Sequence, residues 1–206
     1  MKRNILAASV LLALLSGCQP SAEKPAGQKT AAANSTKSRT LTMNSQDYST
    51  NLVVNKAPEA AFTAIQNFRG WWSEEIEGPT DELNQTFFYH YKDVHLCKLQ
   101  LVEVVPNKKL MYLVLDNEFN FVKDKTEWVG TKLIFELTPE AGQTKIAFTH
   151  QGLVPEDECY QVCQDAWTSY IQGSLKELIE TGKGKPNGKE GGLNDELVKK
   201  WGLPDK

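Results

Sequence analysis

The sequence holds few of the residue types on which catalytic and nucleic-acid-binding sites depend. Only three histidines occur in 206 residues, and there is no G-x-S-x-G elbow, H-E-x-x-H pair, glycine-rich phosphate loop or Ser-His-Asp set. A basic excess is lacking too, since the formal charge is −3. Nucleic-acid binders carry basic faces, so we expect no nucleic-acid partner. We also expect no cofactor, and the missing motifs favour a non-enzymatic protein.

A long hydrophobic run is absent as well, apart from one short stretch at the N-terminus. Lys2 and Arg3 precede an apolar segment, residues 5–15, that is too short to span a bilayer as a stable helix. It ends in Leu-Ser-Gly-Cys, which resembles the bacterial lipobox. Residues 1–17 therefore predict a lipoprotein signal peptide, with Cys18 as the lipidated residue. The alternative is an ordinary secretory signal followed by a chance cysteine.

The segment after the signal contains no aromatic residue. Residues 18–40 are rich in Ser, Ala, Lys, Pro, Gly and Thr, a composition typical of a flexible tether. We expect contact with the membrane through the lipid anchor only, because several acyl chains make a stable anchor. The predicted location is the cell envelope, facing the periplasm. Gln19, by resemblance to enterobacterial sorting rules, favours the outer membrane.

The remaining chain suits one domain and a tail. Residues 41–184 are enough for a substantial core, and no internal repeat occurs. Residues 185–206 are rich in Gly and Lys and read as a C-terminal tail. One short helical pattern, residues 193–201, could let that tail dock through Trp201.

The order of the expected elements indicates an α+β fold. Strand patterns are expected at residues 48–55, 86–92, 94–105, 109–115, 128–137 and 144–153. A helix is expected at residues 58–68, ended by Gly70, and a long loop at residues 116–126. A long amphipathic helix is expected to begin at Pro155 and to end at Gly182. Strand runs flanked by helices favour an antiparallel sheet with helices on one face.

Several stretches of this domain resemble one superfamily. FRGWWSEEIEG, DKTEWVGTKLIFEL and FTHQGLVPEDECYQVCQDAW are similar to SRPBCC (START-like) proteins, and most similar to the branch named after activators of the heat-shock-protein-90 ATPase. The similarity runs from about Tyr48 to Pro186. It implies a helix-grip fold, in which a curved antiparallel sheet wraps around a long C-terminal helix and a cavity lies between them.

Such a cavity would be lined by aromatic side chains. Large apolar pockets with a few polar groups are the usual ligand sites, although the same aromatics could simply fill the core. The candidates are Trp71, Trp72, Phe87, Tyr89, Tyr91, Tyr112, Trp128, Phe135, Phe148, Trp167 and Tyr170. His150 is the polar candidate, because strand alternation points it inward. It could orient a ligand carbonyl or act as an acid or base, or it could be a buried histidine satisfied by a neighbouring hydroxyl or carbonyl.

Three cysteines remain once Cys18 is set aside. Cys159 and Cys163 stand one helical turn apart, with Cys163 on the apolar stripe and Cys159 at its edge. The open readings are a disulfide, a redox pair, a metal site that adds Cys97 and His95 or His150, and buried thiols acting as small apolar residues. The last reading is favoured, and the family resemblance supports it.

The functional prediction is a lipid-anchored exported domain that binds a small apolar or amphipathic molecule in an internal cavity. One alternative is a protein-interaction module of the co-chaperone type without a ligand cavity. Another is a cyclase- or hydrolase-like enzyme that uses His150. The sequence identifies no protein partner.

Overall fold

The structure is a computed structural model that describes residues 47–189. The predicted signal peptide, Cys18, the tether and the helical pattern around Trp201 lie outside the described residues. Between residues 47 and 189, no helix is both long enough and apolar enough to cross a membrane.

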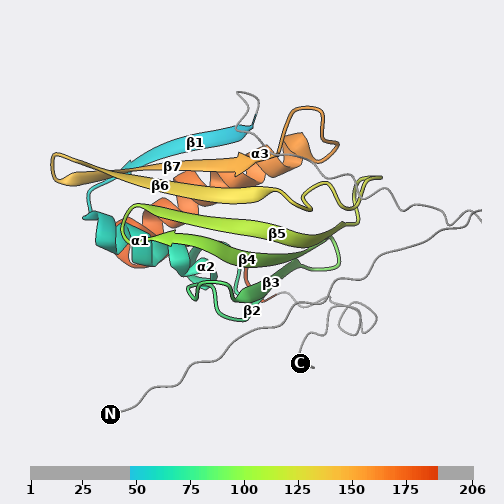
Figure 1. Ribbon diagram of the computed structural model, residues 1–206, viewed down its shortest axis with the longest axis horizontal. Coiled ribbons are helices and arrows are strands. Elements are labelled where there is room, and N and C mark those ends of the chain that lie inside the picture. Colours follow the sequence, from blue (N-terminus) through green and yellow to red (C-terminus); the bar gives the residue numbers. More distant parts are fainter. Residues whose placement is uncertain (1–46, 190–206) are drawn as a thin grey trace, which may run out of the picture. The chain divides into compact units, whose positions relative to one another are not determined.

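A seven-stranded antiparallel sheet forms one layer, in the order β1-β7-β6-β5-β4-β3-β2 (Figure 1). Its order follows from five antiparallel pairings between consecutive strands, from β2 to β7, and from the first strand pairing with the last. The strands are β1 (Tyr48–Val54), β2 (Ile76–Glu77), β3 (Thr86–Tyr91), β4 (His95–Val105), β5 (Lys109–Phe119), β6 (Lys132–Glu140) and β7 (Gln143–Gln151). The β6–β7 turn is Ala141-Gly142, where positive φ angles of 40° and 87° match the twist of the strands, as the turn signal predicted.

The helices form the second layer, and the long C-terminal segment runs behind the strands in Figure 1. This segment is continuous, with a π-helical stretch in its middle. The helices are α1 (Pro58–Gln66), α2 (Phe68–Trp71), α3 (Tyr160–Thr168), η1 (Ser169–Leu175) and α4 (Lys176–Thr181). Gly182 adopts the left-handed conformation (φ 82°) and ends the helix, as expected. The α+β helix-grip architecture is therefore confirmed.

Strand β5 is longer than the sequence pattern suggested. The expected loop at residues 116–126 begins only after Phe119, because a β-bulge interrupts the alternation on which the prediction relied. Leu99 pairs with Val114 and Lys98 with Asp116, so Leu115 is an extra residue. Up to Val114 the even-numbered residues of β5 are buried. Beyond the bulge, Asn117 and Phe119 face the core instead.

The long helix begins later than predicted, at Tyr160 rather than Pro155. Residues 155–159 form turns, because Asp157 accepts the Val154 N–H (2.9 Å) and its own N–H bonds the carbonyl oxygen of Val154 (2.9 Å). Cys159 is fully buried rather than at the edge of the apolar stripe. Two other expectations are corrected: Gly70 lies within α2 rather than ending a helix, and β6 begins at Lys132 rather than at residue 128.

Candidate functional site

A cleft of about 350 Å³ opens where the sheet and the long helix separate. Its walls come from the facing ends of β3, β4 and β5, the loop after β5, the helices α3 and η1, and the segment after α4. The lining residues are Trp72, Tyr89, Tyr91, Val94, His95, Phe119, Phe121, Trp128, Val162, Cys163, Ala166, Trp167, Tyr170 and Asn187. None of these side chains is an acid, a lysine or an arginine.

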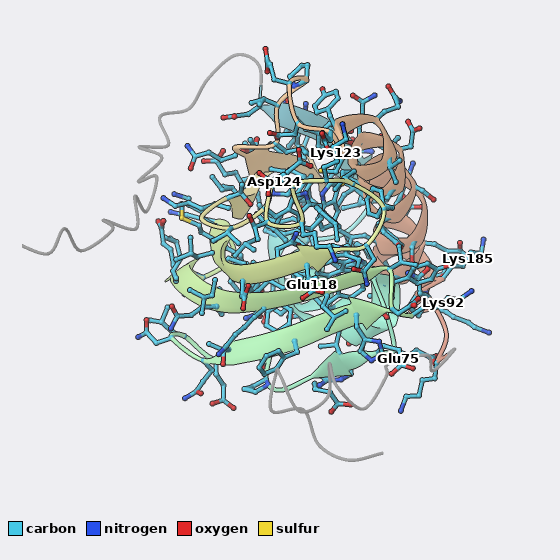
Figure 2. All side chains as sticks on the ribbon, turned by 90° about the vertical axis from the view of Figure 1, so that its right-hand side faces the viewer. Glu75, Lys92, Glu118, Lys123, Asp124 and Lys185 are labelled. Atoms are coloured by element: carbon cyan, nitrogen blue, oxygen red, sulfur yellow. The ribbon has the colours of Figure 1, made fainter. Side chains whose placement is uncertain are left out.

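Charged groups lie around this end of the sheet but outside the cleft. Figure 2 looks along the sheet from the right-hand side of Figure 1 and shows Lys92, Lys123 and Lys185 at the surface. All three are exposed, and Lys185 Nζ pairs with Glu177 Oε2 at 2.6 Å. The cleft is therefore an apolar hollow within a polar surface.

The structure brings together about half of the predicted aromatic candidates. Those that line the cleft are Trp72, Tyr89, Tyr91, Trp128, Trp167 and Tyr170. The others pack in the core around Phe68 and β6, away from the cleft, and they are Trp71, Phe87, Tyr112, Phe135 and Phe148.

The aromatic walls are nearly parallel in two places. Trp72 and Tyr89 stack with ring centroids 4.0 Å apart and planes 21° apart. Trp128 and Trp167 stack with ring centroids 5.7 Å apart and planes 14° apart. Trp72 also contacts Trp167, with ring centroids 5.1 Å apart, so the four rings form one continuous aromatic cluster. Stacked and edge-to-face pairs of this kind stabilise a site by about 0.5–1.5 kcal/mol beyond the area that they bury.

His95 is the imidazole in the cleft wall. Its Nε2 lies 2.8 Å from Asn117 Oδ1, and Asn117 Nδ2 donates to the Lys125 carbonyl at 2.9 Å. The amide is thereby oriented with its oxygen toward the ring, so His95 donates from Nε2 and carries a lone pair on Nδ1. Burial lowers the pKa of His95 to about 3, and the hydrogen bond that His95 donates to Asn117 offsets this only in part. The ring is neutral at physiological pH.

His150 is adjacent to the cleft but does not line it. Trp167 Nε1 donates to His150 Nδ1 at 3.0 Å, so His150 must donate from Nε2 to Thr131 Oγ1, 2.9 Å away. Thr131 then donates to the Trp128 carbonyl at 2.6 Å. Burial, and secondly the proximity of His95, lowers the pKa of His150 to about 3. With both nitrogens engaged, this ring ties the helix to the sheet and has no atom left for a ligand.

The three cysteines of the described region are free and buried. The hydrogen bond with Cys163 is the main cause that raises the pKa of the Cys159 thiol, followed by burial and by Glu127. Burial likewise raises the pKa of the Cys97 thiol. Cys163 alone lines the cleft. Within residues 47–189 no group of three His, Cys, Asp or Glu side chains could hold a metal ion, so the set of Cys97, Cys159, Cys163 and His95 has no support there.

A reciprocal clamp holds the loop that carries Trp128 against the start of α3. Glu127 accepts the backbone N–H groups of Glu158 and Cys159, at 2.5 and 2.9 Å. Glu158 in turn accepts the N–H of Lys123 at 2.7 Å. Carboxylates favour a helix N-terminus, where free N–H groups and the helix dipole coincide. The sequence signal for this contact was weak, since the partners lie about thirty residues apart.

Residues just after α4 complete the cleft, within the segment that the sequence assigned to a tail. Asn187 forms a parallel bridge with Ser73, and its Nδ2 donates to the Tyr170 hydroxyl at 2.6 Å. Gly184 packs so tightly that an added Cβ would lie 2.2 Å from the Gly70 carbonyl oxygen. Sequence reasoning also missed five further lining residues: Val94, Phe119, Phe121, Val162 and Ala166. The positions of Phe119 and Phe121 depend on the bulge in β5 and on the loop that follows.

Solved structures similar to this chain share its fold. The Aha1 dimer from Colwellia psychrerythraea aligns with a TM-score of 0.55 and 21% identity, covering 67% of this chain and 98% of that chain. DynU16, from the dynemicin biosynthetic locus, aligns with a TM-score of 0.52 and 16% identity, covering 77% of this chain and 61% of that chain. A Staphylococcus saprophyticus protein aligns with a TM-score of 0.51 and 16% identity, covering 68% of this chain and 96% of that chain. At these identities the similarity shows the fold alone. No curated protein matches the chain.

One family model matches the sequence over residues 60–180, more than half of the chain. The match begins within α1 and ends within α4, and it includes every strand but β1. It agrees with the superfamily that the sequence motifs resembled. The chain belongs to the family of activator of Hsp90 ATPase homolog 1-like proteins.

Proposed function

We propose that this protein is a lipid-anchored, exported domain that binds a small apolar or amphipathic molecule in the cleft between the sheet and the long helix. The observation that carries the proposal is the cleft itself: about 350 Å³, walled by six of the predicted aromatics and free of charged side chains. Ligand pockets range from about 300 to 1,000 Å³ and are mostly apolar with a few polar groups. This cleft is at the small end of that range.

The proposed anchor rests on the sequence of the N-terminus. The short apolar segment before Cys18 resembles a lipoprotein signal, and about twenty residues with a composition typical of a tether separate Cys18 from the domain. A domain tethered in this way would face the periplasm, with the outer membrane as the proposed site. Its cleft could then take a ligand from solution or from the membrane surface within reach of the tether.

The cyclase- or hydrolase-like alternative has less support. An acid or base must lie within hydrogen-bond reach of the substrate, whereas both nitrogens of His150 already bond Trp167 and Thr131. Its low pKa, about 3, also makes it a weak base. No observation favours the co-chaperone alternative over ligand binding.

A cleft-filling substitution tests the proposed function. Ala166 lines the cleft, and Ala166→Trp should occupy most of the available volume. We expect wild-type protein purified from its own host to carry a small molecule in native mass spectra, and Ala166→Trp to lose it. The matched control is Gln161→Trp, which places the same bulk on an exposed position of α3.

Two results would contradict the proposal. One is wild-type protein that carries no small molecule but retains a protein partner, which would favour the interaction module. The other is Ala166→Trp protein that is folded by circular dichroism and still carries the same molecule at the same stoichiometry.

A further inference from the structure

The cleft lacks any group that could compensate a charged ligand. None of its fourteen lining residues is an acid, a lysine or an arginine, and His95 is held neutral by burial, with its pKa lowered to about 3. Moving an ionised carboxylate or ammonium into such surroundings without a partner costs several kcal/mol. The walls therefore select a neutral molecule over a fatty acid, an amine or a phosphate.

The shape of the walls favours a flat molecule. Eight of the fourteen lining residues are Phe, Tyr or Trp, and those that keep exposed surface are Tyr91, Phe121 and Tyr170, so the cleft offers the faces and edges of rings rather than a tube of aliphatic side chains. A planar aromatic ligand can stack on these faces and has few torsions to restrict on binding. A flexible alkyl chain would gain less contact and lose more conformational freedom.

His95 offers a polar atom of the wall to a ligand. His95 Nδ1 carries a lone pair, since Nε2 donates to Asn117, and it has no hydrogen-bond partner among residues 47–189. His95 is 8% exposed as a residue, whereas Trp128 Nε1 is fully buried and has no partner in that same range. Because His95 is held by Asn117 and packed edge-on against Trp128 (centroids 4.8 Å apart), this acceptor has a fixed position.

We propose that the cleft recognises a neutral, planar aromatic molecule that carries a hydrogen-bond donor of the phenol type, and that His95 Nδ1 accepts this hydrogen bond. The proposal rests on the proposed function, because it names the chemical class of the molecule that the same cleft binds. His95 is a binding residue in this scheme and transfers no proton.

Three probes of similar size separate the elements of the proposal: 1-naphthol, 1-methoxynaphthalene and 1-naphthoate. They differ in having a donor, no donor and a negative charge, respectively. The protein is the full chain carrying Cys18→Ser, so that no acyl chain competes for the cleft, and the measurement is quenching of tryptophan fluorescence at pH 7. We expect 1-naphthol to bind roughly five- to tenfold more tightly than 1-methoxynaphthalene, as one added hydrogen bond allows. 1-Naphthoate should bind most weakly.

The variant His95→Phe removes the acceptor and keeps a ring of similar size. We expect the affinity ratio of 1-naphthol to 1-methoxynaphthalene to fall to about one, whereas a general loosening of the cleft would weaken both probes equally. His95→Leu serves as a second variant should His95→Phe fold poorly. The matched control is Tyr112→Phe, which removes a buried hydroxyl outside the cleft and should preserve the ratio.

The outcomes distinguish this inference from the function on which it rests. If the neutral probes bind equally to the wild type, or if the ratio survives in His95→Phe, the phenol-type assignment is wrong and apolar binding still stands. If 1-naphthoate binds most tightly, the preference for neutral molecules is wrong. If no probe binds and the protein from its host carries no small molecule, the proposed function itself fails.

Discussion

Replacing Trp167 with alanine is expected to lower the free energy of unfolding by about 3–5 kcal/mol, the usual cost of removing a large buried aromatic side chain. Trp167 is 1% exposed and contacts Trp72, Trp128 and Phe148. The substitution also removes the donor to His150 Nδ1, leaving a buried acceptor unsatisfied. Urea unfolding followed by far-ultraviolet circular dichroism measures the change.

The same helix provides the control. Val162 is 57% exposed, and Val162→Ala should change the free energy of unfolding by less than about 0.5 kcal/mol, as is usual for surface substitutions. A loss below about 1 kcal/mol for Trp167→Ala would show that Trp167 does not hold helix and sheet together. The stacking of Trp167 and its hydrogen bond to His150 would then contribute little to the stability of the fold.

Replacing Cys18 with serine is expected to abolish lipid attachment altogether. The serine hydroxyl cannot take the place of the thiol that accepts the diacylglyceryl group, so metabolic labelling with radioactive palmitate should give no signal in the purified chain. Cys163→Ser is the matched control, because Cys163 is buried against the cleft and should have no part in lipidation. Label that persists in Cys18→Ser, or is absent from the wild type, would show that the N-terminus is not a lipoprotein signal.

Strand alternation was a reliable guide wherever the strands are regular. It placed Phe87 and Tyr89 on the inner face of β3, and His95 and Cys97 on the inner face of β4; all four are buried. Alternation works here because successive side chains of a strand point to opposite faces and only one face meets the helices.

The pattern failed at the bulge in β5, and the candidate site depends on that failure. The extra residue Leu115 reverses which residues face inward, so Asn117 and Phe119 reach the cleft end of the core. Asn117 then orients His95. A bulge leaves no clear mark in a single sequence, since Leu115 reads equally well as the last residue of a regular strand.

Long-range contacts account for the other misses. The start of α3 is set by Glu127, which lies about thirty residues before it, rather than by the local signal at Pro155. Which aromatics line the cleft depends on tertiary packing, as the neighbours Trp71 and Trp72 illustrate. Trp71 Nε1 donates to the Ile65 carbonyl inside the core, whereas Trp72 faces the cleft.

Nuclear magnetic resonance of the tryptophan indole N–H groups tests ligand binding in the cleft most directly, because the chain carries its own internal control. On titration with 1-naphthol we predict that the indole signals of Trp72, Trp128 and Trp167 shift together and saturate, while the signal of Trp71 stays within error. Saturation at one ligand per chain would place the molecule in the cleft. No shift at any cleft indole, or an equal shift of Trp71, would contradict the account.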